Sequence, residues 1–175
     1  MIERGELLPW LTSTGGPFIA VPDSVRSQWR GADPDCDFEG PLDTWGDYGR
    51  ACQATDSAST EYYVAVIEVG GVEALVLGEG KGSVTFLRDR LLFVQYAPAG
   101  PESEFLAGLD AGLPGLPWRR SAFTWTVTGP ARLIDSASAA EDSEPHLAVD
   151  VPPGTYSIDY CDSDSIFVML SPSTR

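Results

Sequence analysis

Basic side chains are scarce in this chain, and that scarcity limits the ligands it can favour. The sequence has 11 Lys and Arg residues against 26 Asp and Glu residues, which gives a formal net charge of −15 at pH 7. A surface with this charge repels the phosphate backbone of nucleic acids and anionic membrane surfaces. We therefore expect neither nucleic acid nor a membrane as a partner, whereas a basic protein would be attracted over a distance. The alternative is that the acidity serves solubility alone.

Histidine occurs once, as His146, which follows Glu144-Pro145 at the start of a predicted strand. A hydrolytic triad needs a base beside its nucleophile, and no Ser or Cys here stands in a recognisable nucleophile motif. The glycine-rich run from Gly78 to Ser83 lacks the spacing of a phosphate-binding loop, and a strand rather than a helix is predicted to follow it. We therefore expect a protein that is not an enzyme and that needs no cofactor.

Cysteine is also scarce, and long apolar runs are missing. Cys36, Cys52 and Cys161 form an odd set without the spacing of metal ligands. Charged residues interrupt the first ten positions, so these lack the apolar core of a signal peptide. No stretch approaches the roughly 18 apolar residues that a membrane helix requires. We expect reduced thiols and a cytoplasmic location, with a disulfide between Cys36 and Cys52 as the alternative.

Turn-forming residues are abundant and separate many short extended runs. The chain has 18 Gly and 14 Pro in 175 residues. This pattern predicts an α+β fold that is mainly antiparallel β, with two β-rich halves and a few short helices. The predicted strands are 18–21, 62–69, 73–77, 84–87, 91–96, 122–127, 131–134, 146–151, 155–160 and 166–170, and the predicted helices are 24–29, 47–52 and 102–109.

The predicted elements fall into two groups around a connection rich in proline and glycine. Residues 1–97 form the first β-rich half, residues 98–121 the connection with a short helix, and residues 122–175 the second half. We expect the two halves to make one compact unit. Within the first half, the four strands between 62 and 96 are predicted to form an antiparallel meander, because Gly70-Gly71 suits a tight hairpin.

Acidic residues gather in two tracts that contain no Lys or Arg. The first runs from Asp33 to Asp47 and has six carboxylates, and the second runs from Asp135 to Asp164 and has eight. Such clustering costs self-repulsion in the folded state, so it suggests a surface that faces positive charge, with solvated loops as the alternative. Trp45 is the best candidate for an exposed anchor among them. The predicted partner-binding residues are Asp33, Asp35, Asp37, Glu39, Asp43, Trp45 and Asp47.

The first acidic tract also raises the question of calcium, because its carboxylates alternate along the chain. The register does not match an EF-hand loop: Phe38 stands where the glycine is needed, Thr44 where the closing Glu is needed, and Pro34 stiffens the start. We therefore predict no metal site.

Several separate motifs stand in order along the first half of the chain: Trp10 with Ser13, Gly15-Gly16-Pro17, 19–22, Trp29, Asp47-Tyr48, Arg50-Ala51-Cys52, 64–69 and 74–78. Together they resemble the immunity protein 21 family of bacterial polymorphic toxin systems. The resemblance is clear from Trp10 to Tyr96 and departs from the family pattern at Gly78-Glu79-Gly80-Lys81, where the family has an acidic turn, and at Gln95, where it has Arg.

The resemblance implies a protein that binds and neutralises a cognate toxin, and it carries over no catalytic residue. The implied mechanism is occlusion, in which acidic loops cover the basic cleft of a toxin such as a nuclease. The alternative is a regulatory or scaffold module that binds another basic protein through the same loops. We interpret the following motif residues as structural: Trp10, Gly15, Gly16, Pro17, Trp29, Tyr48, Arg50 and Cys52.

Overall fold

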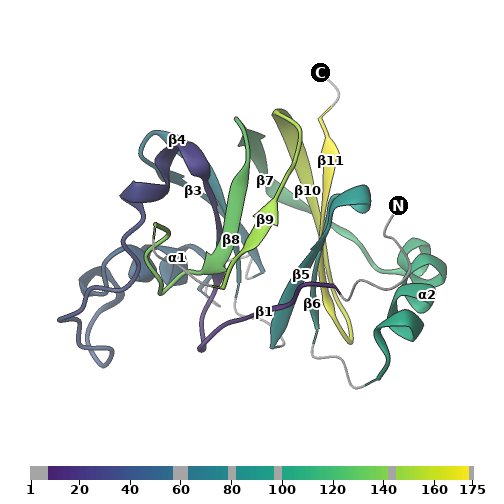
Figure 1. Cartoon of the computed structure of the whole chain (residues 1–175), viewed down its shortest axis with the longest axis horizontal. Coiled ribbons are helices and arrows are strands. Elements are labelled where there is room, and N and C mark those ends of the chain that lie inside the picture. Colours follow the sequence, from purple (N-terminus) through teal and green to yellow (C-terminus); the bar gives the residue numbers. More distant parts are fainter. Residues whose placement is uncertain (1–7, 57–62, 79–81, 97–99, 142–144, 174–175) are drawn as a thin grey trace.

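The computed structural model of the chain describes residues 8–56, 63–78, 82–96, 100–141 and 145–173. Within these residues, eleven strands form two antiparallel sheets, accompanied by two α-helices and four short 3-10 helices (Figure 1). The predicted fold class, α+β and mainly antiparallel β, is confirmed. None of the helices in the described part of the chain is long and apolar enough to span a membrane.

The first sheet has the strand order β1-β5-β6-β11-β10-β7, and the second has the order β3-β4-β2-β8-β9. Each sheet therefore combines strands from before and after the connection at 98–121. The strands are β1 (Leu11–Thr12), β2 (Phe18–Pro22), β3 (Val64–Val69), β4 (Val72–Leu77), β5 (Ser83–Leu87), β6 (Leu92–Tyr96), β7 (Arg119–Val127), β8 (Ala131–Asp135), β9 (Leu147–Val149), β10 (Gly154–Asp162) and β11 (Ile166–Pro172).

The meander predicted between 62 and 96 is wrong. Its strands form two separate hairpins, β3–β4 and β5–β6, which lie in different sheets. The free edge of β4 pairs with β2, where Phe18 lies opposite Leu77, and β5 pairs with β1, where Leu11 lies opposite Val84. Short-range turn signals identify a hairpin, but the long-range pairing is decided by which faces can be buried together. Tyr62, the predicted start of β3, lies outside the described residues.

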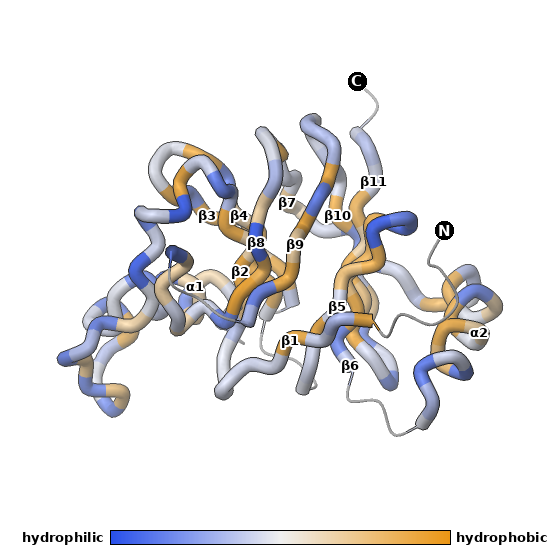
Figure 2. The backbone as a smooth tube through the Cα atoms, in the orientation of Figure 1, coloured by the Kyte–Doolittle hydropathy of each residue, from blue (hydrophilic) through white to orange (hydrophobic). Residues whose placement is uncertain are grey.

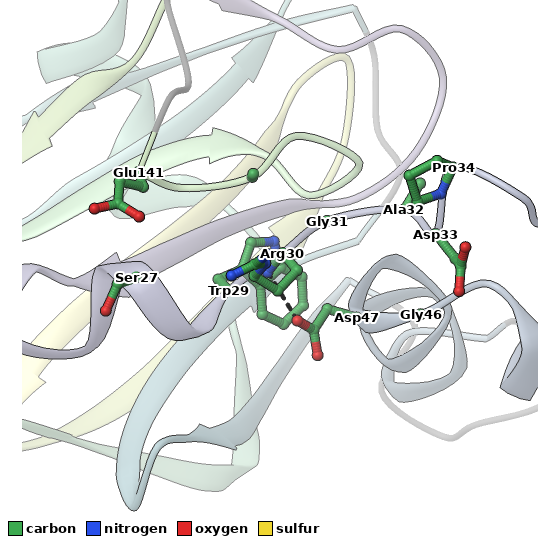
Figure 3. Close-up of a pocket in the computed structure, with 11 residues that line it drawn as sticks. Ser27, Trp29, Arg30, Gly31, Ala32, Asp33, Pro34, Gly46, Asp47 and Glu141 are labelled. Carbon is green, nitrogen blue, oxygen red and sulfur yellow. Dashed lines mark hydrogen bonds between the residues drawn. The ribbon is translucent and has the colours of Figure 1, made fainter.

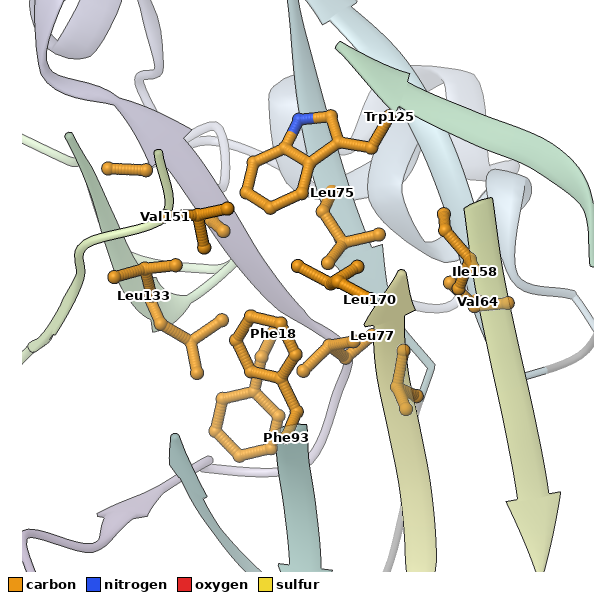
Figure 4. Packing of buried hydrophobic residues seen from close by; sticks show 14 of the residues in the cluster. Phe18, Val64, Leu75, Leu77, Phe93, Trp125, Leu133, Val151, Ile158 and Leu170 are labelled. Carbon is orange, nitrogen blue, oxygen red and sulfur yellow. The ribbon is translucent and has the colours of Figure 1, made fainter. Parts of the chain in front are cut away.

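The main core lies between the two sheets, and β2 shows how the sequence builds it. All five residues of β2 are buried, because this central strand has a covered face on each side. Phe18 and Ala20 point into the core between the sheets, whereas Ile19 and Val21 belong to a second cluster on the opposite face. Figure 4 shows the inter-sheet core around Phe18, including Phe93, Trp125 and Ile158.

Helices cover the outer face of each sheet, so the molecule has four layers (Figure 1). The 3-10 helix η1 (Asp23–Gln28), the buried Trp29 and helix α1 (Asp47–Ala54) cover the sheet that contains β2. Helix α2 (Glu102–Gly112), followed by η4 (Leu113–Gly115), covers the sheet that contains β6 and β11. Figure 2 shows the consequence: hydrophobic residues follow the strands, and hydrophilic ones gather in loops and turns.

The predicted helices at 47–52 and 102–109 are confirmed as α1 and α2. The predicted helix at 24–29 is instead the 3-10 helix η1, in which Val25 has non-helical angles. The start of η1 has no side-chain cap hydrogen bond, and Trp29, which follows the helix, is extended. In so short a segment, burying Val25 and Trp29 against the sheet stabilises the fold more than a regular α-helix would.

Candidate protein-binding surface

The first acidic tract forms a loop, residues 33–46, which we call the acidic loop. It includes the 3-10 helix η2 (Leu42–Thr44) and lies at the end of the molecule that carries α1 (Figure 1). Main-chain hydrogen bonds close its base: Asp33 N donates to Trp45 O at 3.1 Å, and Tyr48 N donates to Gly31 O at 3.0 Å. Gly46 has a φ of +71°, and a Cβ there would lie 3.0 Å from Asp33 N, so the closure depends on this glycine.

Two carboxylates of the acidic loop shape it from within. Asp33 Oδ1 accepts a hydrogen bond from Asp35 N at 3.0 Å, and Asp37 Oδ1 accepts one from Glu39 N at 2.9 Å. Side chains of Asp that bond the main chain two residues ahead stabilise turns. In contrast, the exposed side chains of Asp35, Glu39 and Asp43 form no ion pair with any described residue. Asp33 and Asp37 therefore stabilise the conformation of the loop, whereas the other three carboxylates face solvent.

Three aromatic rings pack together beside these carboxylates, and we call them the aromatic cluster: Phe38, Trp45 and Tyr48. Trp45 and Tyr48 are stacked, with ring centroids 5.9 Å apart at 14°. Phe38 presents an edge-type contact to both, at 5.2 Å from Trp45 and 6.1 Å from Tyr48. The indole nitrogen of Trp45 donates to Asp37 O at 3.0 Å, which ties the cluster to the acidic loop.

The exposed member of the aromatic cluster is Phe38 rather than the predicted Trp45. Phe38 is 57% exposed, and no other large hydrophobic residue in the described part of the chain is classed as exposed. Trp45 is half-buried, because it stacks on Tyr48 and bonds Asp37. Sequence reasoning did not identify Phe38 as the exposed ring and used it only to reject an EF-hand. The available signal was a single phenylalanine between two carboxylates in a loop rich in turn residues.

A hollow of about 540 Å³ lies against the aromatic cluster. The three rings line it together with Leu42, Cys52, Thr55, Asp56 and the segment Gly15-Gly16-Pro17. Tyr48 Oη donates to Gly15 O at 3.2 Å, and a Cβ on Gly16 would collide with the same hydroxyl. The structure therefore brings two sequence motifs, Gly15-Gly16-Pro17 and Asp47 to Cys52, to one place.

Asp47 differs from the rest of its tract because both of its carboxylate oxygens are engaged. One accepts a hydrogen bond from Arg30 N at 2.8 Å, and the other pairs with Arg50 Nη1 at 2.8 Å. Arg50 also donates to Glu68 O and lies over the ring of Trp29, 5.9 Å from its centroid. Trp29 is fully buried and donates its indole N–H to Ser136 O at 3.1 Å. This network joins α1 to η1 and to the sheet behind them.

A second hollow, of about 580 Å³, is lined by three residues of the Asp47 network, Trp29, Arg30 and Asp47. Figure 3 shows Arg30, Asp33, Asp47 and Glu141 around it, with the hydrogen bond between Arg30 and Asp47 drawn as a dashed line. Its lining contains both signs of charge, so it offers a less uniform environment than the hollow at the aromatic cluster.

Trp10 and Cys52 are motif residues with different surroundings, and only Cys52 lies near the aromatic cluster. Trp10 lies at the opposite end of the molecule, where its indole nitrogen donates to Glu102 Oε1 at 3.0 Å and its ring lies 6.1 Å from that of Phe105. Cys52 is half-buried in α1 and lines the hollow. Cys36, Cys52 and the third cysteine are free thiols, so the alternative of a disulfide between Cys36 and Cys52 is wrong.

The second acidic tract is largely engaged within the fold. Asp150 pairs with Arg88 at 2.6 Å, and Asp159 pairs with Arg120 at 2.6 Å. Asp135 is buried and accepts hydrogen bonds from the main chain and hydroxyl of one threonine and from a main-chain N–H, namely Thr14 N (2.9 Å), Thr14 Oγ1 (2.8 Å) and Ala137 N (3.0 Å). Asp142 and Glu144 of this tract lie outside the described residues.

Groups with catalytic or metal-binding chemistry are dispersed in the described part of the chain. No three of its His, Cys, Asp or Glu side chains are placed to hold a metal ion. Burial raises the pKa of the Cys161 thiol, and the negative charge of Asp162 raises it further. A thiol with a raised pKa stays protonated near neutral pH and is a weak nucleophile.

Comparison with known proteins gives one match. A family model described as immunity protein 21 matches residues 9–165, which is most of the 175-residue chain and includes the acidic loop, the aromatic cluster and the Asp47 network. Neither the curated proteins nor the solved structures provide a match. The resemblance noted in the sequence is confirmed, and the chain belongs to the immunity protein 21 family.

Proposed function

We propose that this protein is a non-catalytic immunity protein that binds a cognate toxin and covers its active or substrate-binding surface with the acidic loop. Family membership supports a toxin as the partner. The observation that carries the choice of surface is the pairing of exposed Phe38 with unpaired carboxylates on one folded loop: Asp35, Glu39 and Asp43.

The charge of the loop suits a basic partner such as a nuclease, whose cleft must attract phosphate. Carboxylates on the inhibitor occupy the same positive cleft and speed the encounter by long-range attraction. The aromatic cluster supplies apolar area for the centre of the interface, where aromatic residues contribute most. Asp33 and Asp37 hold the loop in turns before binding, so less conformational entropy is lost in the complex. We place this neutralisation in the cytoplasm.

Co-expression tests the proposal directly. The toxin domain encoded beside the gene is induced in cells with and without this protein, and the complex is then isolated through a tag on the toxin. We expect survival only with the protein present, and a stable complex of defined stoichiometry. Death of the cells and no complex would contradict the proposal and favour a regulatory or scaffold module that binds a different basic protein.

Titration of the purified toxin separates binding from catalysis. If the protein acts by covering the toxin, toxin activity falls in proportion to added protein and is abolished at the stoichiometry of the complex. Complete inactivation at a small fraction of that amount would show that the protein turns over, and would contradict a non-catalytic mechanism.

A further inference from the structure

The hollow against the aromatic cluster is lined by ring surfaces and lies beside a loop rich in carboxylates. Phe38, Trp45 and Tyr48 all line it, and Phe38 is the exposed one of the three rings. Ten described residues line the hollow; none of these ten is basic, and one of them, Asp56, carries a carboxylate. The acidic loop, from which two of the rings come, contributes further carboxylates that have no cationic partner among the described residues, namely Asp35, Glu39 and Asp43.

These features favour a cation with a flat, weakly hydrated head. An aromatic ring attracts a cation through the negative electrostatic potential of its face, and neighbouring carboxylates add a Coulomb attraction. A guanidinium can stack on a ring while its edge donates hydrogen bonds to carboxylates and main-chain oxygens. An ammonium group is more strongly hydrated and cannot stack in this way. A neutral apolar side chain would gain nothing from the charge.

The chain already uses the same arrangement inside the fold. The guanidinium of Arg50 lies over the ring of Trp29 at 5.9 Å from its centroid while it pairs with Asp47. There, all three groups come from one chain. At the hollow, the described lining residues supply three rings and one carboxylate but no basic group, and the acidic loop beside them carries further carboxylates.

We propose that the hollow against the aromatic cluster receives an arginine side chain of the bound toxin. This inference rests on the proposed function, because it takes the acidic loop as the surface that meets the toxin. The arginine stacks on the exposed side of the aromatic cluster, and its guanidinium faces the carboxylates of the acidic loop. It supplies the specific contact at the centre of an interface whose approach is guided by the less specific charge around it.

A small-molecule titration tests the hollow without the toxin. N-acetyl-arginine amide is added to the ¹⁵N-labelled protein, and the amide signals of Phe38 and Tyr48 and the indole signal of Trp45 are followed by NMR. The controls are N-acetyl-citrulline amide, which has nearly the same shape without charge, and N-acetyl-lysine amide. We expect saturable shifts at these three residues with the arginine probe, and affinities at least about threefold lower for the other two.

Variants of the exposed ring locate the site. Phe38→Leu keeps an apolar side chain but removes the ring, so we expect arginine binding to weaken by about two- to fivefold. Phe38→Tyr keeps the ring and should bind arginine as the unmodified protein does. Phe105→Leu, a matched change at the other end of the molecule, should have no effect. Equal shifts with citrulline, or undiminished arginine binding by Phe38→Leu, would overturn the inference.

Co-expression with the toxin distinguishes failure of this inference from failure of the proposed function. If Phe38→Leu protects cells and binds the toxin as well as the unmodified protein, the arginine site is wrong and the immunity function stands. If the unmodified protein binds the arginine probe but never protects cells or binds the toxin, the proposed function is wrong while the hollow remains an arginine-binding site.

Discussion

The two acidic tracts have similar compositions and different roles in the fold. The first, from Asp33 to Asp47, contains carboxylates that face solvent without a cationic partner, next to an exposed aromatic ring. In the second, from Asp135 to Asp164, Asp150 and Asp159 pair with arginines and Asp135 is buried in hydrogen bonds, although Glu141 and Asp164 are exposed. Charge density along a sequence therefore does not distinguish carboxylates that face solvent from carboxylates held in a structural network. The distinction comes from what the fold places opposite each carboxylate.

The largest effect should come from Asp135, the buried carboxylate of the second tract. Asp135→Ala leaves three donors on Thr14 and Ala137 without their acceptor, and loss of hydrogen bonds to a charged group destabilises the fold by about 2–3 kcal/mol. Urea unfolding followed by tryptophan fluorescence measures this change. The folded fraction of Asp135→Ala should bind the toxin as the unmodified protein does. A loss below about 0.5 kcal/mol would show that the second tract is not structural at its buried position.

Asp47 should behave like the second tract although it belongs to the first. Its side chain is only 18% exposed and holds Arg50 and the main chain of Arg30. We expect Asp47→Ala to lower the free energy of unfolding by about 1–2 kcal/mol, because the variant loses the hydrogen bond from Arg30 N, the ion pair with the half-exposed Arg50 and a negative charge in the first turn of α1. Asp43→Ala, four residues earlier and exposed, is the matched control and should change stability by less than about 0.5 kcal/mol. Equal stability of the two variants would contradict this division of the tract.

The sequence predicts some features of this fold and not others, and Asp47 and Asp43 are one example. The α+β class, the helix at α1 and most strand positions follow from short-range patterns of apolar and turn residues. The order of strands does not follow from these patterns, because the sequence of a hairpin such as β3–β4 or β5–β6 does not indicate which sheet the hairpin joins. Asp47 and Asp43 look alike in sequence. They differ in the fold, because Arg30 N and the Arg50 side chain contact Asp47.

The candidate site was predictable in part. Composition pointed to the acidic loop, and the family motifs pointed to Gly15-Gly16-Pro17 and Tyr48, which the fold brings together. Phe38 was not predicted, because the loop was identified from its clustered carboxylates, two of which lie on either side of Phe38 in the sequence. Trp45 was expected to be exposed, but the ring beside it in space, that of Tyr48, comes from the following helix and partly covers it.

Charge reversal compares the tracts as surfaces rather than as structural elements. Replacement of Asp35, Glu39 and Asp43 by Lys should slow association with the toxin about tenfold at low salt and flatten its salt dependence, because the steering charge is local. Replacement of Asp150, Asp162 and Asp164 by Lys changes the net charge by the same amount and is the control. Stopped-flow association rates measure both. Equal slowing by the two triple variants would mean that net charge, and not the acidic loop, attracts the toxin.

The smallest effect should come from the ion pair between Arg88 and Asp150, the more exposed of the two arginine pairs in the second tract. Its side chains are 69% and 54% exposed, so solvent screens the attraction and the pair must also lose side-chain entropy to form. A double-mutant cycle with Arg88→Ala and Asp150→Ala, read by urea unfolding, should give a coupling below about 0.5 kcal/mol that vanishes in high salt. A coupling above about 1 kcal/mol would mean that exposure does not decide which carboxylates stabilise the fold. In that case, exposure alone would not show that the carboxylates of the acidic loop are left to bind a partner.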